Sequence, residues 1–207
     1  MDKTMISRHG TADLAALIGS RICHDLISPI GAIGNGIELM AMIPGGADGP
    51  ELELVSDSCR AAQARIRFFR VAFGSSMQSD QTMSANEAGA ILIDFASGGR
   101  QRPDWQATGD LPRSDVQLVF LAYLCFETAL PRGGRIDITR QDGHWQLHAD
   151  SEALSVDASL WSTLTGTPLT ETPTPAHVQF MLLPIVAADL GRAITVGRGE
   201  ARLTLSV

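Results

Sequence analysis

Apolar residues near the start of the chain recur at the spacing of a helix. They follow one another in steps of three or four residues, which places them in one stripe along a helix. The stripe consists of Leu14, Ile18, Ile22, Leu26, Ile30, Ile33, Ile37 and Met40. Thr11 is a candidate N-cap, and Asp13 would complement the helix dipole. Pro44-Gly45-Gly46 interrupts the pattern, so we expect the first helix to end before residue 44.

A second helical pattern follows at once. Pro50 suits the first position of a helix, and Gly74 suits the position just after its end. Between them the apolar steps alternate between three and four residues, as in a coiled-coil seam. The seam consists of Leu52, Val55, Cys59, Ala62, Ile66, Phe69 and Phe73. The short link between the two helices predicts an antiparallel hairpin over residues 1–76.

Two helices cannot enclose a core by themselves. The first solution is that two chains pair their hairpins into a dimeric four-helix bundle, and we expect this arrangement. The alternative is that the hairpin packs onto the rest of its own chain.

After a small, polar linker over residues 75–81, helices and strands alternate. Ser84 followed by Glu87 is a capping box that opens a helix to about residue 96, and Asp142-Gly143 marks a β-hairpin. The other predicted elements are a strand at 105–108, a helix at 116–130 capped by Ser114, the hairpin strands 135–140 and 145–149, helices at 157–164 and 177–190 around a loop at 165–175, and closing strands at 192–196 and 201–207. Helices on one side of a mixed or antiparallel sheet make a two-layer α/β sandwich, which we assign to residues 82–207. The predicted fold class is therefore α+β.

Composition narrows the functional classes. The chain has 207 residues, a net charge of −7 and a pI of about 5.1. This balance argues against nucleic acid as a partner. Cys23, Cys59 and Cys125 are odd in number and far apart, which disfavours a disulfide framework or a zinc site. No apolar stretch is long enough for a membrane span and the first ten residues are polar, so we expect a cytoplasmic protein.

His24 lies in the first predicted helix but outside its apolar stripe. At about 100° per residue it points roughly 200° away from Ile22 and from Leu26. Its helical neighbours, Leu17, Ser20, Ile27, Ser28 and Gly31, form a small and weakly apolar face that another protein could approach closely. Neutral imidazole is a nucleophile at neutral pH, and Asp25 could act as its base or orient it. An exposed histidine without a function is the alternative.

Pro29 lies inside the same helix. It cannot donate the hydrogen bond to the carbonyl of Asp25, which costs roughly 3 kcal/mol. Strain kept beside an exposed nucleophile suggests a functional use, whereas a plain kink is the structural alternative.

The run from His24 to Pro29, His-Asp-Leu-Ile-Ser-Pro, resembles the H-box of histidine kinases. The longer run from Ser20 to Gly36 resembles the ChpT-type histidine phosphotransferases of alphaproteobacteria. The likeness continues at residues 70–74 and at residues 129–134, so it spans essentially the whole chain. It implies a kinase-like hairpin joined to a domain that is similar to a histidine-kinase ATPase domain without ATP binding.

At three places that the resemblance aligns with nucleotide-binding boxes of kinases, this chain departs from the kinase pattern. Cys125 stands where a kinase has the metal-binding asparagine, and a thiol cannot replace that ligand for a hard cation. Asp150 is followed by Ser-Glu-Ala-Leu, without the glycines of a DxGxG box. Residues 179–182, Gln-Phe-Met-Leu, replace a glycine-rich phosphate loop.

The resemblance implies a phosphorelay enzyme, that is, a phosphotransferase with a phosphohistidine intermediate and without ATP-dependent kinase activity. The receiver domain of a hybrid histidine kinase would phosphorylate His24, which would pass the group to response regulators, among them one controlling the cell cycle. No cofactor is expected, because the receiver would supply Mg²⁺. The alternatives are a non-catalytic dimeric adaptor or sequestering protein and a divergent ATP-dependent histidine kinase.

The expected docking surface surrounds His24. It combines the face around the histidine with arginines of both helices, which would steer acidic receivers. It consists of Leu17, Ser20, Arg21, Ile27, Ser28, Gly31, Arg67 and Arg70. A solvated face without a partner is the alternative for the arginines of the second helix.

Overall fold

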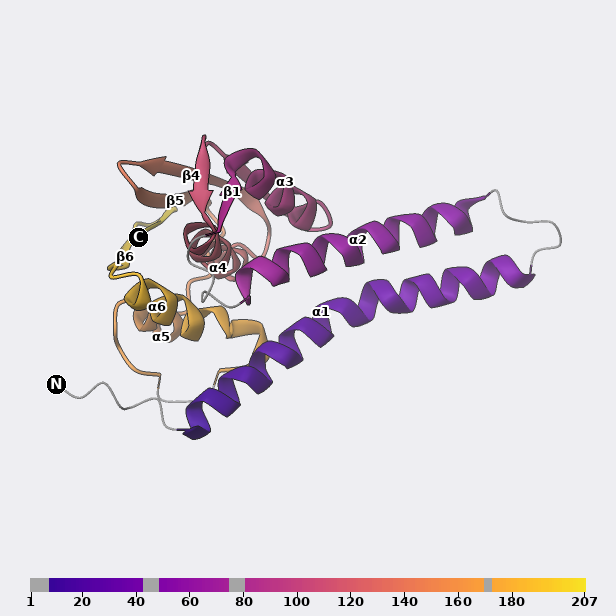
Figure 1. Ribbon diagram of the computed structural model, residues 1–207, viewed down its shortest axis with the longest axis horizontal. Helices are drawn as coiled ribbons and strands as arrows, with labels where there is room; N and C mark the ends of the chain where they lie inside the picture. Colours follow the sequence, from indigo (N-terminus) through magenta and orange to yellow (C-terminus); the bar gives the residue numbers. More distant parts are fainter. Residues whose placement is uncertain (1–7, 43–48, 75–80, 170–172) are drawn as a thin grey trace.

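A computed structural model describes residues 8–42, 49–74, 81–169 and 173–207. Two long helices, α1 (Arg8–Met42) and α2 (Pro50–Ala72), lie antiparallel and form the hairpin, which projects from the rest of the molecule (Figure 1). We call that remainder, from residue 81 onward, the body. The predicted break at residues 44–46 and most of the predicted linker, residues 75–80, lie outside the described residues.

Helix α1 begins earlier than the sequence predicts. It starts at Arg8, so Thr11 lies inside the helix and is not its N-cap. Gly36 is buried, and a Cβ there would collide with Val55 of α2, so this glycine permits the close approach of the two helices. The stripe is only partly covered within one chain: most of its members are half-buried, but Ile30 and Ile37 are 56% and 55% exposed.

Helix α2 begins at Pro50 as predicted, and the backbone N–H of its C-cap residue, Phe73, donates to the carbonyl of Phe69. Its predicted seam is also covered unevenly. Phe69 is buried, whereas Leu52 and Ile66 are 41% and 52% exposed. Within a single chain the seam is thus incompletely covered, because α1 covers only one side of α2.

The last turns of α2 belong to the core of the body. The ring of Phe68 is fully buried and stacks between Phe95 and Phe120, with centroid distances of 3.9 and 4.6 Å. Such aromatic packing adds to the large apolar area that these rings remove from water. Helix α2 is thus anchored in the body at one end and extends away from it at the other.

The body contains a mixed five-stranded sheet in the order β2-β4-β5-β7-β6, with a two-stranded sheet, β1-β3, beside it. Strand β2 runs parallel to β4, and the other neighbours are antiparallel. The strands are β1 (Thr82–Ser84), β2 (Gln101–Trp105), β3 (Asp110–Pro112), β4 (Gly134–Gln141), β5 (His144–Asp150), β6 (Thr195–Arg198) and β7 (Arg202–Ser206). The β4-β5 hairpin is confirmed: Asp142 and Gly143 at its turn have φ of 50° and 82°, as the tightest hairpins require.

One predicted strand lies elsewhere, and two short strands were not predicted. The strand expected at 105–108 lies at Gln101–Trp105, where Arg102, Pro103 and Asp104 are poor strand formers that an edge position tolerates. Strands β1 and β3 were not expected, because three-residue strands carry too few positions for a period to be visible.

The helices of the body are α3 (Ala85–Ala96), α4 (Arg113–Ala129), α5 (Ala158–Thr163), the 3₁₀ turn η1 (Pro175–His177) and α6 (Gln179–Asp189). The predicted N-cap of α3 is confirmed, since Ser84 Oγ accepts from the N–H of Glu87 at 3.1 Å. Ser114 is not the cap of α4: it lies within the helix, which follows Pro112 directly. No helix in the described ranges combines the length and hydropathy that a bilayer crossing requires.

Helix α4 is the centre of the body. All of its residues from 114 to 126 are buried, because it packs against β5, α2 and α6. Asp115, 3% exposed, ties its first turn to the rest of the body. It pairs with Arg192, between α6 and β6, at 2.6 Å, and with Arg140 of β4 at 3.2 Å, and it accepts from the indole N–H of Trp145 of β5 at 3.3 Å. The body is thus a two-layer α+β unit built on one buried helix.

Candidate functional site

His24 projects from the middle of α1 into solvent, with 84% of its side chain exposed. This confirms that it faces away from the apolar stripe. Its Nδ1 lies 3.1 Å from Oδ1 of Asp25. An ionised carboxylate can only accept, so in the neutral ring the proton is on Nδ1, and this N–H donates a hydrogen bond to Asp25. The lone pair of Nε2 is therefore the one that faces solvent.

Pro29 is buried within α1, and the helix continues through it. Since proline has no N–H, the carbonyl of Asp25 lacks the partner that an ordinary helix would give it. The residue that contacts His24 thus lies at the point where the hydrogen-bond ladder of α1 is interrupted.

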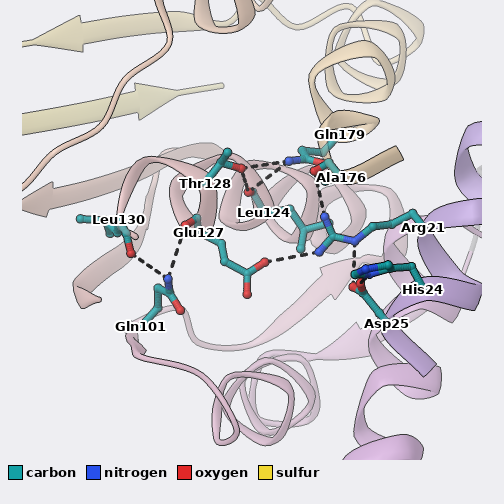
Figure 2. A network of polar contacts seen from close by, with 10 residues as sticks. All are labelled: Arg21, His24, Asp25, Gln101, Leu124, Glu127, Thr128, Leu130, Ala176 and Gln179. Carbon is teal, nitrogen blue, oxygen red and sulfur yellow. Dashed lines mark hydrogen bonds and ion pairs between the residues drawn. The ribbon is translucent and has the colours of Figure 1, made fainter. Parts of the chain in front are cut away.

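Arg21 connects this site to the body (Figure 2). Its Nε donates to Oδ2 of Asp25 at 2.8 Å, one turn further along α1. One terminal nitrogen donates to the carbonyl of Ala176 in η1 at 2.8 Å, and the other lies 3.6 Å from Oε2 of Glu127 in α4. The side chains of Arg21 and Asp25 are only 12% and 15% exposed.

Glu127 lies near the end of α4 and reaches toward α1, with 32% of its side chain exposed. Its burial raises the pKa of the carboxyl, and the neighbouring charges of Arg21 and Arg65 oppose that rise. Gln101 holds the end of α4 in place, because its amide donates to the carbonyl oxygens of Leu130 at 2.9 Å and Glu127 at 3.4 Å.

A groove of about 330 Å³ runs beside the histidine. It combines residues of α1 with residues from α2, α3, α4 and the turn before β2. Its lining is Arg21, His24, Asp25, Ser28, Arg65, Phe95, Gly98, Gly99 and Glu127. That Glu127, Gly98 and Gly99 line a groove with His24 could not be predicted from local patterns, because these segments are distant along the chain.

The predicted docking residues fall into three groups. Ser20, Ile27, Ser28 and Gly31 are exposed around His24, with Ile27 at 71%, and Leu17 is half-buried. Arg21 is not part of the exposed surface, because its partners inside the chain engage it. Arg67 and Arg70 are exposed on α2, where Arg67 pairs with Asp94 at 3.2 Å and lines a separate cleft between α2 and α3.

The resemblance to kinases aligns several residues of this chain with nucleotide-binding boxes. The surroundings of these residues do not fit a nucleotide. Cys125 is fully buried, and burial raises the pKa of its thiol. The buried amide of Gln179 donates to the carbonyl of Leu124, and Phe180 packs edge-on against Trp161. Asp150 pairs with Arg202 at 2.9 Å. Within the described ranges, no cluster of His, Cys, Asp or Glu side chains could hold a metal ion.

Comparison with known proteins places the chain in a family. The family model described as the histidine phosphotransferase C-terminal domain matches residues 85–202. The chain is also 33% identical over 190 residues to the protein phosphotransferase ChpT of Brucella abortus (strain 2308), covering 89% of this chain and 90% of that protein. The chain belongs to the histidine phosphotransferase family. Its structure is similar to one described as a bacterial phosphotransferase at 1.7 Å, with a TM-score of 0.77, 30% identity, and coverage of 94% of this chain and 95% of that one.

The similarity of this phosphotransferase to its relatives therefore includes both the body and the hairpin. The matched region covers the body, and the full-length likeness extends over the hairpin with His24.

Proposed function

We propose that His24 is the phosphoryl-carrying residue of this histidine phosphotransferase. It would accept the group from a receiver aspartate of a hybrid histidine kinase and pass it to the aspartates of response regulators. The observation that carries this proposal is the exposed ring whose Nδ1 lies 3.1 Å from Asp25, which leaves Nε2 open to a partner.

The chemistry follows from that geometry. Nε2 attacks the phosphorus of the partner's aspartyl phosphate, the bond from phosphorus to the carboxylate oxygen breaks, and the carboxylate leaves with the electron pair. The positive charge that develops on the ring is stabilised through the Nδ1–H by Asp25. The reverse attack, by the carboxylate of a response regulator, returns the imidazole to its neutral form.

The partner surface is the exposed part of the face around His24. Ser20, Ser28 and Gly31 are small, and Ile27 supplies apolar area, so a receiver domain can bring its phosphorylated loop close to the ring. We expect the receiver to supply the Mg²⁺ that its own aspartate requires, and the chain to need no cofactor. Since receiver domains of this kind work in the cytoplasm, we place the phosphotransferase there.

The uncovered apolar residues of the hairpin support a homodimer. Ile30, Ile37, Leu52, Leu54 and Ile66 are each at least 41% exposed on two adjacent helices. Pairing with the hairpin of a second copy would cover them in a four-helix bundle.

ATP-dependent kinase activity is disfavoured by the buried side chains of Cys125, Gln179 and Phe180. A dimeric adaptor without chemistry is disfavoured because it would not need the contact of His24 with Asp25. We expect neither saturable ATP binding at submillimolar concentration by calorimetry nor self-phosphorylation from ATP.

The decisive experiment is phosphotransfer from a phosphorylated receiver domain. The wild type should acquire an acid-labile label, and His24→Ala should acquire none, while circular dichroism shows an unchanged fold. His144→Ala is the matched control, since His144 is also exposed but lies on β5. Full labelling of His24→Ala would show that another residue accepts the group.

A further inference from the structure

The carboxylate that contacts His24 is held by a side chain that is itself held by the body. Arg21 donates to Asp25 within α1, and its other two partners, Glu127 and the carbonyl of Ala176, come from α4 and η1. A continuous series of polar contacts therefore runs from His24 through Asp25 and Arg21 to Glu127, that is, from the hairpin into the body (Figure 2).

We propose that Glu127 is a positioning residue for phosphotransfer, which fixes Arg21 beside α4 and thereby fixes Asp25 against Nδ1 of His24. The inference rests on His24 being the phosphoryl acceptor. It gives the degenerate ATPase-like body a part in the chemistry of the hairpin, through contacts and not through a nucleotide.

Geometry supports a positioning role. Arg21 has several rotatable bonds, and it would lose rotamer freedom only where several partners hold it. The partners on the body approach the guanidinium from outside α1, so they determine which way its Nε points. Asp25 accepts from that Nε through one oxygen and faces His24 with the other. A displacement of Arg21 is therefore passed on to the oxygen that contacts the ring.

The charges support the same role. Four charged side chains line the groove beside His24: Arg21, Asp25, Arg65 and Glu127. If Asp25 were the only carboxylate beside Arg21, the guanidinium would largely neutralise its charge. Glu127 lies beside the same guanidinium, so the two carboxylates share its positive charge. The sharing leaves Asp25 more negative toward the ring as positive charge develops on it.

The test is the isosteric variant Glu127→Gln in the full chain. With a phosphorylated receiver as donor, we expect the maximal rate to fall about 5- to 10-fold, as the loss of one charge-assisted contact would give. The receiver concentration at half-maximal rate should stay unchanged, because Glu127 is not one of the exposed residues around His24 that form the docking face. The nitrogen-15 shifts of the His24 ring, read through its carbon-bound protons, should move toward those of a ring without a fixed acceptor.

A double-mutant cycle separates positioning from general damage. Arg21→Ala should lower the maximal rate at least as far as Glu127→Gln, and adding Glu127→Gln to Arg21→Ala should cause no further loss, because Glu127 acts through Arg21. Independent, multiplying losses would overturn the proposal.

Thr128→Val is the matched control. Thr128 is the neighbour of Glu127, and its hydroxyl bonds to Leu124 and Gln179 but does not reach Arg21. This variant should lower the melting temperature without lowering the rate per folded molecule. Wild-type rate and ring shifts in Glu127→Gln would refute the positioning role alone, whereas labelling of His24→Ala would refute the acceptor on which the role rests.

Discussion

The hairpin and the body bury their apolar side chains by different means. In the body, α4 is covered on every side by elements of the same chain, and all of its residues from 114 to 126 are buried. In the hairpin, α1 and α2 cover each other on one side only, and large apolar side chains such as Ile37 and Ile66 are more than half exposed. The body is complete within one chain, whereas the hairpin has a further apolar face to cover.

The same contrast applies to chemistry. In the body, Cys125, Gln179 and Phe180, which the sequence resemblance aligns with nucleotide-binding boxes, are each fully buried. The hairpin instead exposes His24 on a face of small side chains. In the proposed function, the hairpin therefore does its chemistry with an imidazole left in the open, whereas the body buries the side chains named above.

The largest effect is expected in the body, at Asp115, whose contacts hold α4 against its neighbours. Asp115→Ala leaves Arg140 and Arg192 without their shared acceptor, and we expect a loss of about 3 kcal/mol in the free energy of unfolding. The loss stays at the lower end for a buried pair because both arginines are about a quarter exposed and can reach water. Chemical denaturation checks this, with Glu200→Ala, on an exposed turn, as the control. A change below 1 kcal/mol would show that the cluster is dispensable.

The hairpin is probed by Ile66→Glu. In a single chain this side chain is half exposed, so the change alone should cost little, within about 0.5 kcal/mol. In a four-helix bundle it buries an unpaired charge, and we expect the dimer to dissociate at micromolar concentration. Light scattering measures the mass. Ile93→Glu is the matched control, because Ile93 is equally exposed, at 52%, but lies on α3 of the body. A monomeric wild type would contradict the dimer.

Much of this contrast could be predicted from the sequence because it depends on local patterns. The three- and four-residue steps of the hairpin, the N-cap at Ser84 and the turn at Asp142-Gly143 each act within a few residues, and the structure confirms them. The outward direction of His24 followed from its angle on α1. The division into residues 1–76 and 82–207 stays a prediction. The two parts share a core where they meet, because Phe68 of α2 packs between rings of the body.

What the sequence could not show depends on tertiary contact. Strand β2 contains Pro103 and two charged residues, and only its pairing with β4 makes it a strand. The position of Arg21 was predicted on the docking surface, because its local pattern is that of an exposed helical residue. The contact with Glu127 that removes it from that surface joins two helices far apart in the sequence, and no periodicity reports such a contact.

A substitution on the docking face around His24 should have a smaller effect than the substitutions at Asp115 in the body and at Ile66 in the hairpin. A Cβ on Gly31 would meet nothing within 4 Å, so Gly31→Arg should fold normally. Its bulk beside His24 should lower the second-order rate of phosphotransfer about 10-fold, chiefly through weaker binding of the receiver. Gly31→Ala is the control: it should stabilise α1 and lower the rate far less than Gly31→Arg does, because a methyl group adds little bulk. Unimpaired transfer to Gly31→Arg would place the receiver elsewhere on the molecule.

The smallest effect is a pH dependence at the point where hairpin and body meet. Burial raises the pKa of Glu127 above its ordinary value of 4.5, so the folded protein holds that proton to higher pH than the unfolded chain does. The contribution of the neutral carboxyl to stability is therefore present below the ordinary pKa and is lost as the pH rises through the folded one. The glutamine of Glu127→Gln cannot ionise. The free energy of unfolding of this variant should therefore increase relative to that of the wild type as the pH rises from about 4 to 7. Denaturant midpoints at both pH values measure this difference. A difference that shrank with rising pH would mean that Arg21 outweighs burial, and that the ion pair stabilises the folded protein as well as holding Asp25.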